Sequence, residues 1–141
     1  MLHNLPMRLI AEIVGGVLAV VLLLVALWLI RRKRQIKQVQ KFQSRWKEIQ
    51  KMCAKAESWP QAVTHADKLV DEVLKAAGYR GRTMGERLVA AQRTLSDNDG
   101  MWFAHKLSGR INNEEMNRLY KKDVQAALRG HRQALQDLGA L

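Results

Sequence analysis

Cysteine and proline are scarce in this sequence, and their scarcity excludes several kinds of functional site. The 141 residues include one Cys and two Pro. A single Cys supports neither an intramolecular disulfide framework nor a Cys-x-x-Cys zinc site. The sequence also lacks a Walker loop, a Gly-x-Ser-x-Gly motif, a His-Glu-x-x-His motif and a dinucleotide-binding glycine pattern. We therefore expect a protein that is not an enzyme and that binds no cofactor or metal.

Charged residues are absent from one long apolar run, residues 13–30. Eighteen helical residues span roughly 27 Å, close to the hydrocarbon thickness of a bilayer. A signal peptide would have a shorter apolar region followed by a small-x-small cleavage site, and so small a protein could not surround a buried core helix of this kind. The run therefore predicts a transmembrane helix after a short extracytoplasmic N-terminus, residues 1–12.

Positive charge is concentrated directly after this run. The net charge is +11, but residues 31–55 hold ten basic residues and one acidic residue, whereas residues 56–141 hold 13 and 11. Basic flanks stay in the cytoplasm, so we expect a single-pass protein of the cell inner (plasma) membrane with its N-terminus outside. The same charges favour anionic lipid head groups as partners over nucleic acid. The predicted membrane-surface cluster is Arg31, Arg32, Lys33, Arg34 and Lys37.

Residues 31–57 are expected to continue the membrane helix as a basic amphipathic helix, because no Gly or Pro occurs between Val17 and Trp59. One apolar stripe runs along it at steps of three or four residues. This stripe could lie on the membrane, form a coiled coil or pack on the following domain, and the large side chains of Phe42 and Trp46 favour packing. A homodimer through Gly15 and Ala19, a small-xxx-small pair, is a further alternative.

Apolar spacing in residues 58–141 predicts four helices and no strand, so the fold class is all-α with a four-helix bundle-like cytoplasmic domain. The first helix begins at Ser58 as N-cap and ends at Gly78, and Thr83 to Glu86 form a capping box that begins the second. That second helix runs to about Leu95, and residues 96–100 form a loop. The expected inner positions of the last three helices are Leu88, Val89, Leu95, Met101, Trp102, His105, Leu107, Leu119, Tyr120, Val124, Ala127, Leu128, His131, Leu135 and Leu138.

Two carboxylates one turn apart, Asp67 and Asp71, lie on one face of the first of these helices. Such a pair could bind a metal or act as acid and base. We favour solvated side chains, or ion pairs with a base such as Arg82 or Lys106. His105 lies one turn after Trp102 and is expected to be a hydrogen-bonded core histidine. Phe42, Trp46, Asp67, Asp71, Trp102 and His105 are thus the candidate packing or interaction residues.

A resemblance is carried by the stretch from Trp102 to Glu114, WFAHKLSGRINNE, with Ala66-Asp67 upstream and ALQDLG at 134–139 downstream. It resembles a group of small bacterial single-pass membrane proteins whose soluble part is similar to HEPN-type helical bundles, over about residues 45–141. In that superfamily an Arg, a following polar residue and a His five positions after the Arg cleave RNA. Ser108, Gly109 and Asn113 stand at those positions here, so the resemblance implies the bundle without the ribonuclease chemistry.

These observations favour a membrane protein that presents a helical protein-interaction domain to a cytoplasmic protein. The alternative is a membrane-tethered RNA-binding or degenerate HEPN-type nuclease module. A third interpretation, an enzyme that uses Asp67 and Asp71, depends on the carboxylate pair alone.

Overall fold

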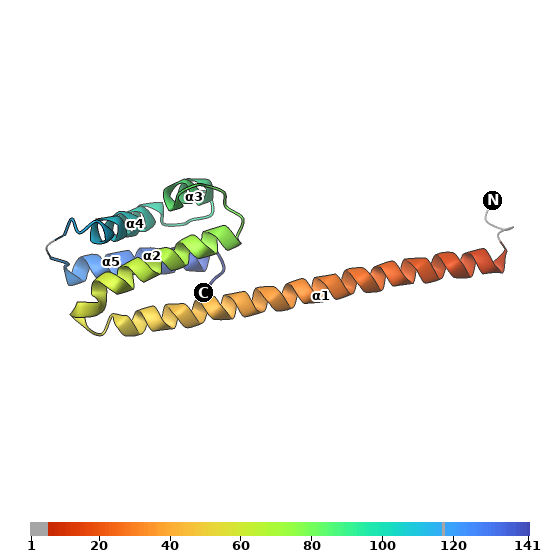
Figure 1. Cartoon of the computed structure of the whole chain (residues 1–141). Helices are drawn as coiled ribbons and strands as arrows, with labels where there is room; N and C mark the ends of the chain where they lie inside the picture. Colours follow the sequence, from red (N-terminus) through yellow and green to blue (C-terminus); the bar gives the residue numbers. More distant parts are fainter. Residues whose placement is uncertain (1–5, 117) are drawn as a thin grey trace. The chain divides into compact units, whose positions relative to one another are not determined.

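The computed structural model describes residues 6–116 and 118–141, and within these ranges every regular element is a helix (Figure 1). The chain divides into two compact units, the first ending at Gln38 and the second beginning at Val39. The elements are α1 (Met7–Met52), the short 3-10 helix η1 (Ala56–Ser58), α2 (Trp59–Ala76), α3 (Met84–Ala91), α4 (Asn98–Asn112) and α5 (Lys121–Asp137).

The first unit contains the apolar part of α1. In the described residues, α1 is the one helix that is long and apolar enough to cross a membrane by length and composition, with a mean hydropathy of 3.0 over its best 18-residue window. None of that window is buried within the protein. The Arg32 guanidinium lies 5.3 Å from the centre of the Trp28 ring, a cation–π contact at the end of the apolar run. Side chains this apolar and this exposed require a nonaqueous environment or a partner.

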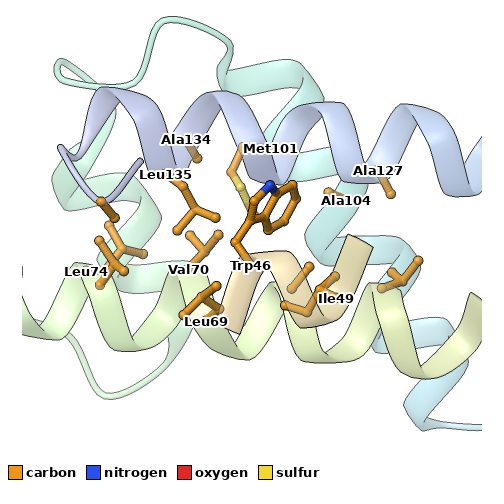
Figure 2. Close-up of a cluster of buried hydrophobic side chains, with 14 of the residues drawn as sticks. Trp46, Ile49, Leu69, Val70, Leu74, Met101, Ala104, Ala127, Ala134 and Leu135 are labelled. Carbon is orange, nitrogen blue, oxygen red and sulfur yellow. The ribbon is translucent and has the colours of Figure 1, made fainter. Parts of the chain in front are cut away.

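The second unit is built on α2, α4 and α5, which pack on one another, while α3 lies against α2 (Figure 1). The amphipathic pattern of α2 explains its central position, because its apolar residues recur every three or four positions and half of its residues are buried. The last turns of α1 contribute Phe42, Trp46 and Ile49 to the same core. Figure 2 shows the Trp46 indole in one cluster with Val70, Met101 and Leu135.

Two local signals define the connection between α2 and α3. Gly78 follows α2 with a φ of +88°, the left-handed conformation that ends many helices and that glycine adopts without a Cβ penalty. The Thr83 hydroxyl then accepts a hydrogen bond from the Glu86 backbone N–H at 3.2 Å. The Glu86 carboxylate in turn accepts from the backbone N–H of Arg82 at 2.6 Å. This is the expected cap, with the reciprocal bond one residue earlier than in the standard capping box.

Several expected helix ends and inner positions differ from the structure. Ser58 precedes α2, but its side chain makes no capping hydrogen bond, because it belongs to η1 and has helical backbone angles. α3 ends at Ala91, before Leu95, and α4 begins at Asn98, inside the expected loop 96–100, with the Asp97 side chain as its cap. Val89 and Tyr120 are exposed, the latter because α5 begins only at Lys121.

The closest approach of α4 and α5 requires a glycine. A Cβ at Gly130 of α5 would lie only 2.6 Å from the carbonyl carbon of Gly100 and would also clash with its oxygen. We expect Gly130→Ala to destabilise the second unit by about 1–3 kcal/mol, because backbone atoms must move apart. Gly109→Ala is the matched control, since nothing lies within 4 Å of its added methyl group, and it should gain up to about 1 kcal/mol from helix propensity. Chemical unfolding followed by circular dichroism measures both, and equal effects would contradict this packing.

Candidate functional site

A buried carboxylate on α2, Asp67, receives hydrogen bonds from two histidines on other helices. Nδ1 of His105, on α4, donates to Oδ2 of Asp67 at 3.0 Å. Nε2 of His131, on α5, donates to Oδ1 at 3.2 Å. His131 is fully buried, and its other ring nitrogen has no hydrogen-bond partner. The carboxylate therefore links the three central helices through their polar side chains.

These contacts change the proton affinities of Asp67 and His105. Burial raises the pKa of Asp67, but hydrogen bonds from His105 and His131 and the charges of both rings outweigh it, so the net pKa lies below its ordinary value. The hydrogen bond to Asp67 raises the pKa of His105 above 6.5, and this effect exceeds the opposing effect of burial. The negative charges of Asp67 and Asp71 act in the same direction on His105. Protonated His105 and ionised Asp67 thus stabilise each other.

This ion pair predicts a pH dependence of stability. Because the folded state raises the pKa of His105, its stabilisation is fully present below pH 6.5 and is lost as the pH rises through the raised value. We expect the melting temperature of the full chain in neutral detergent to fall over that range. In the His105→Gln variant, this fall of the melting temperature with rising pH should disappear. An unchanged slope in the variant would show that another group causes it.

Asp71 has a structural partner on each side. Its carboxylate accepts from Nε of Arg87, on α3, at 2.7 Å and pairs with Lys75, one turn further along α2, at 2.9 Å. Burial opposes ionisation, but these two cations outweigh it and hold the pKa of Asp71 below its ordinary value. The sequence predicted solvated side chains or ion pairs with a base such as Arg82 or Lys106. Asp71 does form ion pairs, and the bases are Arg87 and Lys75. The Arg87 guanidinium also donates to the carbonyl of Gly81 at 2.5 Å.

Trp102 packs beside the histidine of the same helix. The two rings meet edge to face, with their centres 5.9 Å apart, and both residues are half-buried. The expected core histidine at 105 is therefore hydrogen-bonded as predicted but reaches the surface, while His131 is the fully buried one. Among the described residues, no group of three or more His, Cys, Asp or Glu side chains has the arrangement of a metal site.

The three positions at which the HEPN resemblance would place catalytic residues lie on α4 and at its C-cap. Ser108 is buried, Gly109 is half-buried, and Asn113 is exposed at the C-cap of the helix. A serine, a glycine and an asparagine supply neither the cation nor the general acid and base that cleavage of a phosphodiester by Arg and His requires. His105 is the one imidazole on this helix, and its Nδ1 is engaged by Asp67.

A groove lies between the last turns of α1 and the exposed side of α5. It consists of two adjoining hollows of about 450 and 270 Å³ that share Trp46, Gln50 and Arg132. Apolar side chains from both helices line it together with three basic residues. The remaining lining residues are Gln43, Lys47, Ile49, Cys53, Gln125, Leu128, Arg129, Gln136 and Leu141. The volumes are those of ligand sites in proteins, and the groove is open to solvent.

The basic cluster predicted next to the membrane lies on α1 in the first unit. Arg31, Arg32, Lys33, Arg34 and Lys37 are all exposed. Exposure on a helix that follows an apolar run is the placement in which such side chains reach lipid head groups. The cluster belongs to the first unit, whereas Asp67 and Asp71 belong to the second unit.

Three residues of the Asp67 cluster and the groove, namely His131, Arg129 and Arg132, were not among the predicted site residues. His131 had a signal, because it is a polar residue at an inner position of an otherwise apolar stripe between Ala127 and Leu135. Arg129 and Arg132 had none, since they are exposed residues of α5 whose importance depends on where α1 packs.

No protein-family model, curated protein or solved structure matches the chain.

Proposed function

We propose that this chain is a non-enzymatic single-pass membrane protein that presents a four-helix bundle-like domain to protein partners in the cytoplasm. The observation that carries the proposal is the uncharged run 13–30, on the same helix as a basic cluster and followed by a folded unit. An apolar helix with no burial in its own protein is stable in a bilayer, where only a helix or a closed barrel satisfies the backbone.

The charge distribution supports an orientation with the N-terminus outside and residues 31–141 in the cytoplasm of a bacterial cell. Arg8 and Glu12 balance on one side of the apolar run, whereas Arg31 to Arg34 follow it on the other. Basic residues close to a membrane helix remain on the cytoplasmic side. The exposed cluster also attracts anionic head groups, at about 1 kcal/mol for each charge near the surface.

The polar residues of the second unit support interaction in preference to catalysis. Asp67 and Asp71, which could serve as acid and base, are each engaged by neighbouring basic side chains within the core or at its edge. The exposed groove between α1 and α5 combines apolar and charged lining. Helix pairs with such a surface bind other polypeptides.

Single-cysteine variants test the membrane proposal. With Cys53→Ser as background, Met7→Cys should react with a membrane-impermeant maleimide in intact spheroplasts. Ser44→Cys should react only after lysis. Both positions are exposed, so access to the reagent is the variable. Reaction of the second variant in intact spheroplasts would reverse the orientation, and recovery of a soluble chain that lacks residues 1–30 would show a cleaved signal sequence.

The alternative is a membrane-tethered RNA-binding module, or a HEPN-type nuclease fold that has lost its catalytic residues. The sequence around His105, with Trp102 before it, favours this alternative. The full chain in neutral nanodiscs should then bind a single-stranded oligonucleotide with a steep dependence on salt. Undetectable binding at moderate salt would leave protein interaction as the function, whereas tight, salt-sensitive binding would replace it.

A further inference from the structure

We propose that the groove between α1 and α5 binds an acidic amphipathic helix of a partner protein. The inference rests on the proposed interaction function and assigns that function a surface and a partner chemistry. The groove is lined on one side by residues 43–53 of α1 and its C-terminal end, and on the other by residues 125–136 of α5. Within the described part of the chain, the groove is lined by these two segments and Leu141.

The shape of the groove suits a helix. Its two walls are helical segments of about three turns each, roughly 15–17 Å long at the rise of an α-helix. The furrow between two helices accepts the side-chain ridges of a third, as in helical bundles. A single small ligand would fill one hollow, whereas a helix of three to four turns spans both, which are continuous through Trp46, Gln50 and Arg132.

The floor of the groove supplies apolar contacts. Trp46 and Ile49 are buried in the core yet line the first hollow, and Leu128 and Cys53 beside them are half-buried. An indole next to aliphatic side chains is the kind of centre that anchors interfaces. Leu141 extends the apolar lining into the second hollow. A partner helix would therefore need apolar residues at i, i+3 or i+4, and i+7.

The rim of the groove determines the sign of the charge that the partner helix carries. Lys47, Arg129 and Arg132 line the groove and are exposed, and none of the described residues that line either hollow is an Asp or Glu. Arginine binds carboxylates through two parallel hydrogen bonds and is common at protein interfaces. Gln43, Gln50, Gln125 and Gln136 add neutral donors and acceptors along both walls. The complementary helix thus has Glu or Asp on the flanks of its apolar stripe.

Cys53 provides a local reporter of occupancy. It is the one cysteine of the chain, it lines the first hollow, and its thiol donates to the carbonyl of Ile49 at 3.2 Å. The probe is a synthetic 16-residue helical peptide with leucines at one face and glutamates beside them. We expect saturable binding to the full chain in phosphatidylcholine nanodiscs, and saturating peptide should slow alkylation of Cys53. A peptide with lysines in place of the glutamates, and one with serines in place of the leucines, should do neither.

Charge reversal locates the site. Arg129→Glu/Arg132→Glu should weaken peptide binding at least about tenfold and abolish the protection of Cys53. Arg93→Glu/Lys106→Glu, an equal charge change at exposed positions outside the groove, should leave both unchanged. Arg129→Gln/Arg132→Gln should have an intermediate effect. All variants should unfold at the wild-type temperature. Binding that persists in the groove variant, or that leaves Cys53 unprotected, overturns the proposal.

Other occupants give different results. If a second copy of the chain fills the groove, each nanodisc will hold two chains instead of one. Charge reversal at Arg129 and Arg132 will then return the number of chains per nanodisc to one. If anionic lipid fills it, phosphatidylglycerol nanodiscs without peptide will protect Cys53. If RNA fills it, an oligonucleotide will protect the thiol. Each result overturns the acidic-helix assignment. Failure of the proposed membrane function would appear in the topology experiment, which does not involve the groove.

Discussion

Replacing Trp46 by alanine is expected to lower the free energy of unfolding of the second unit by about 3–5 kcal/mol, the usual cost of removing a buried tryptophan. The indole is 6% exposed and packs among residues of α2, α4 and α5 (Figure 2). Its removal leaves a cavity against these helices and deprives the last turns of α1 of their largest contact. The loss is a large fraction of the stability of a small domain.

The sequence contains a matched control. Trp28, in the first unit, is 57% exposed, and Trp28→Ala should leave the unfolding of the second unit unchanged. Both variants are compared as full chains in neutral micelles, with urea unfolding followed by circular dichroism and limited proteolysis. A small effect of Trp46→Ala, similar to that of Trp28→Ala, would mean that α1 does not stabilise the second unit.

The helical class of the protein was predictable because local signals and apolar spacing agree. The run 13–30, the capping residues around Thr83 and the glycine at 78 each act within a few residues of chain, so their effect is visible in the sequence. The spacing of Phe42, Trp46 and Ile49 indicated one apolar face. A stripe on a basic helix can lie on a membrane surface, form a coiled coil or pack on a core. The large side chains of Phe42 and Trp46 favoured packing, and both lie in the core of the second unit.

The expected features that were wrong depend on contacts between distant segments. Val89 continues the apolar pattern of α3, but α3 has only eight residues and turns that position outward. Asp71 selects Arg87 because the chain folds back between α2 and α3, bringing together residues 16 apart. Judged by distance along the sequence alone, Arg82 was as reasonable a partner for Asp71 as Arg87. The helix at α3 was predicted to run too far for the same reason, since it ends where the chain must reverse toward α4. The next helix was predicted to begin too late, because α4 begins at Asn98.

The residues of the candidate site likewise fall into two groups, those that the sequence indicated and those that only the folded chain reveals. Asp67 and His105 were selected from residue type and position, and the structure brings them within 3.0 Å of each other. His131 completes that cluster from α5, and only the packing of three helices reveals the link. The groove was not predictable at all, because Arg129 and Arg132 are ordinary exposed residues of an amphipathic helix. They become a rim only when Trp46 places the other wall of the groove opposite α5.

Asp67→Ala is expected to destabilise the second unit by about 3 kcal/mol or more, because a buried charged partner is removed from two hydrogen bonds. His131, which has no solvent contact, would keep a buried Nε2–H without an acceptor, next to an Nδ1 that already lacks a partner. Asp67→Asn should cost less, since its amide oxygen still accepts one of the two bonds. Glu72→Ala on the same helix removes an ion pair with Arg45 that is largely exposed, and it should cost no more than about 1 kcal/mol.

Combining Asp67→Ala with His105→Gln separates the two roles of the carboxylate. If Asp67 stabilises the fold mainly by satisfying His131, His105→Gln alone will cost much less than Asp67→Ala. The double variant will be nearly as unstable as Asp67→Ala alone, and neither of these two variants will show the wild-type fall in stability above pH 6.5. If its main role is the ion pair with His105, His105→Gln alone will cost as much as Asp67→Ala. The first outcome is expected, because His131 is fully buried whereas the His105 side chain keeps 28% of its surface in solvent. Solvent can replace the lost acceptor for His105, but no solvent reaches His131.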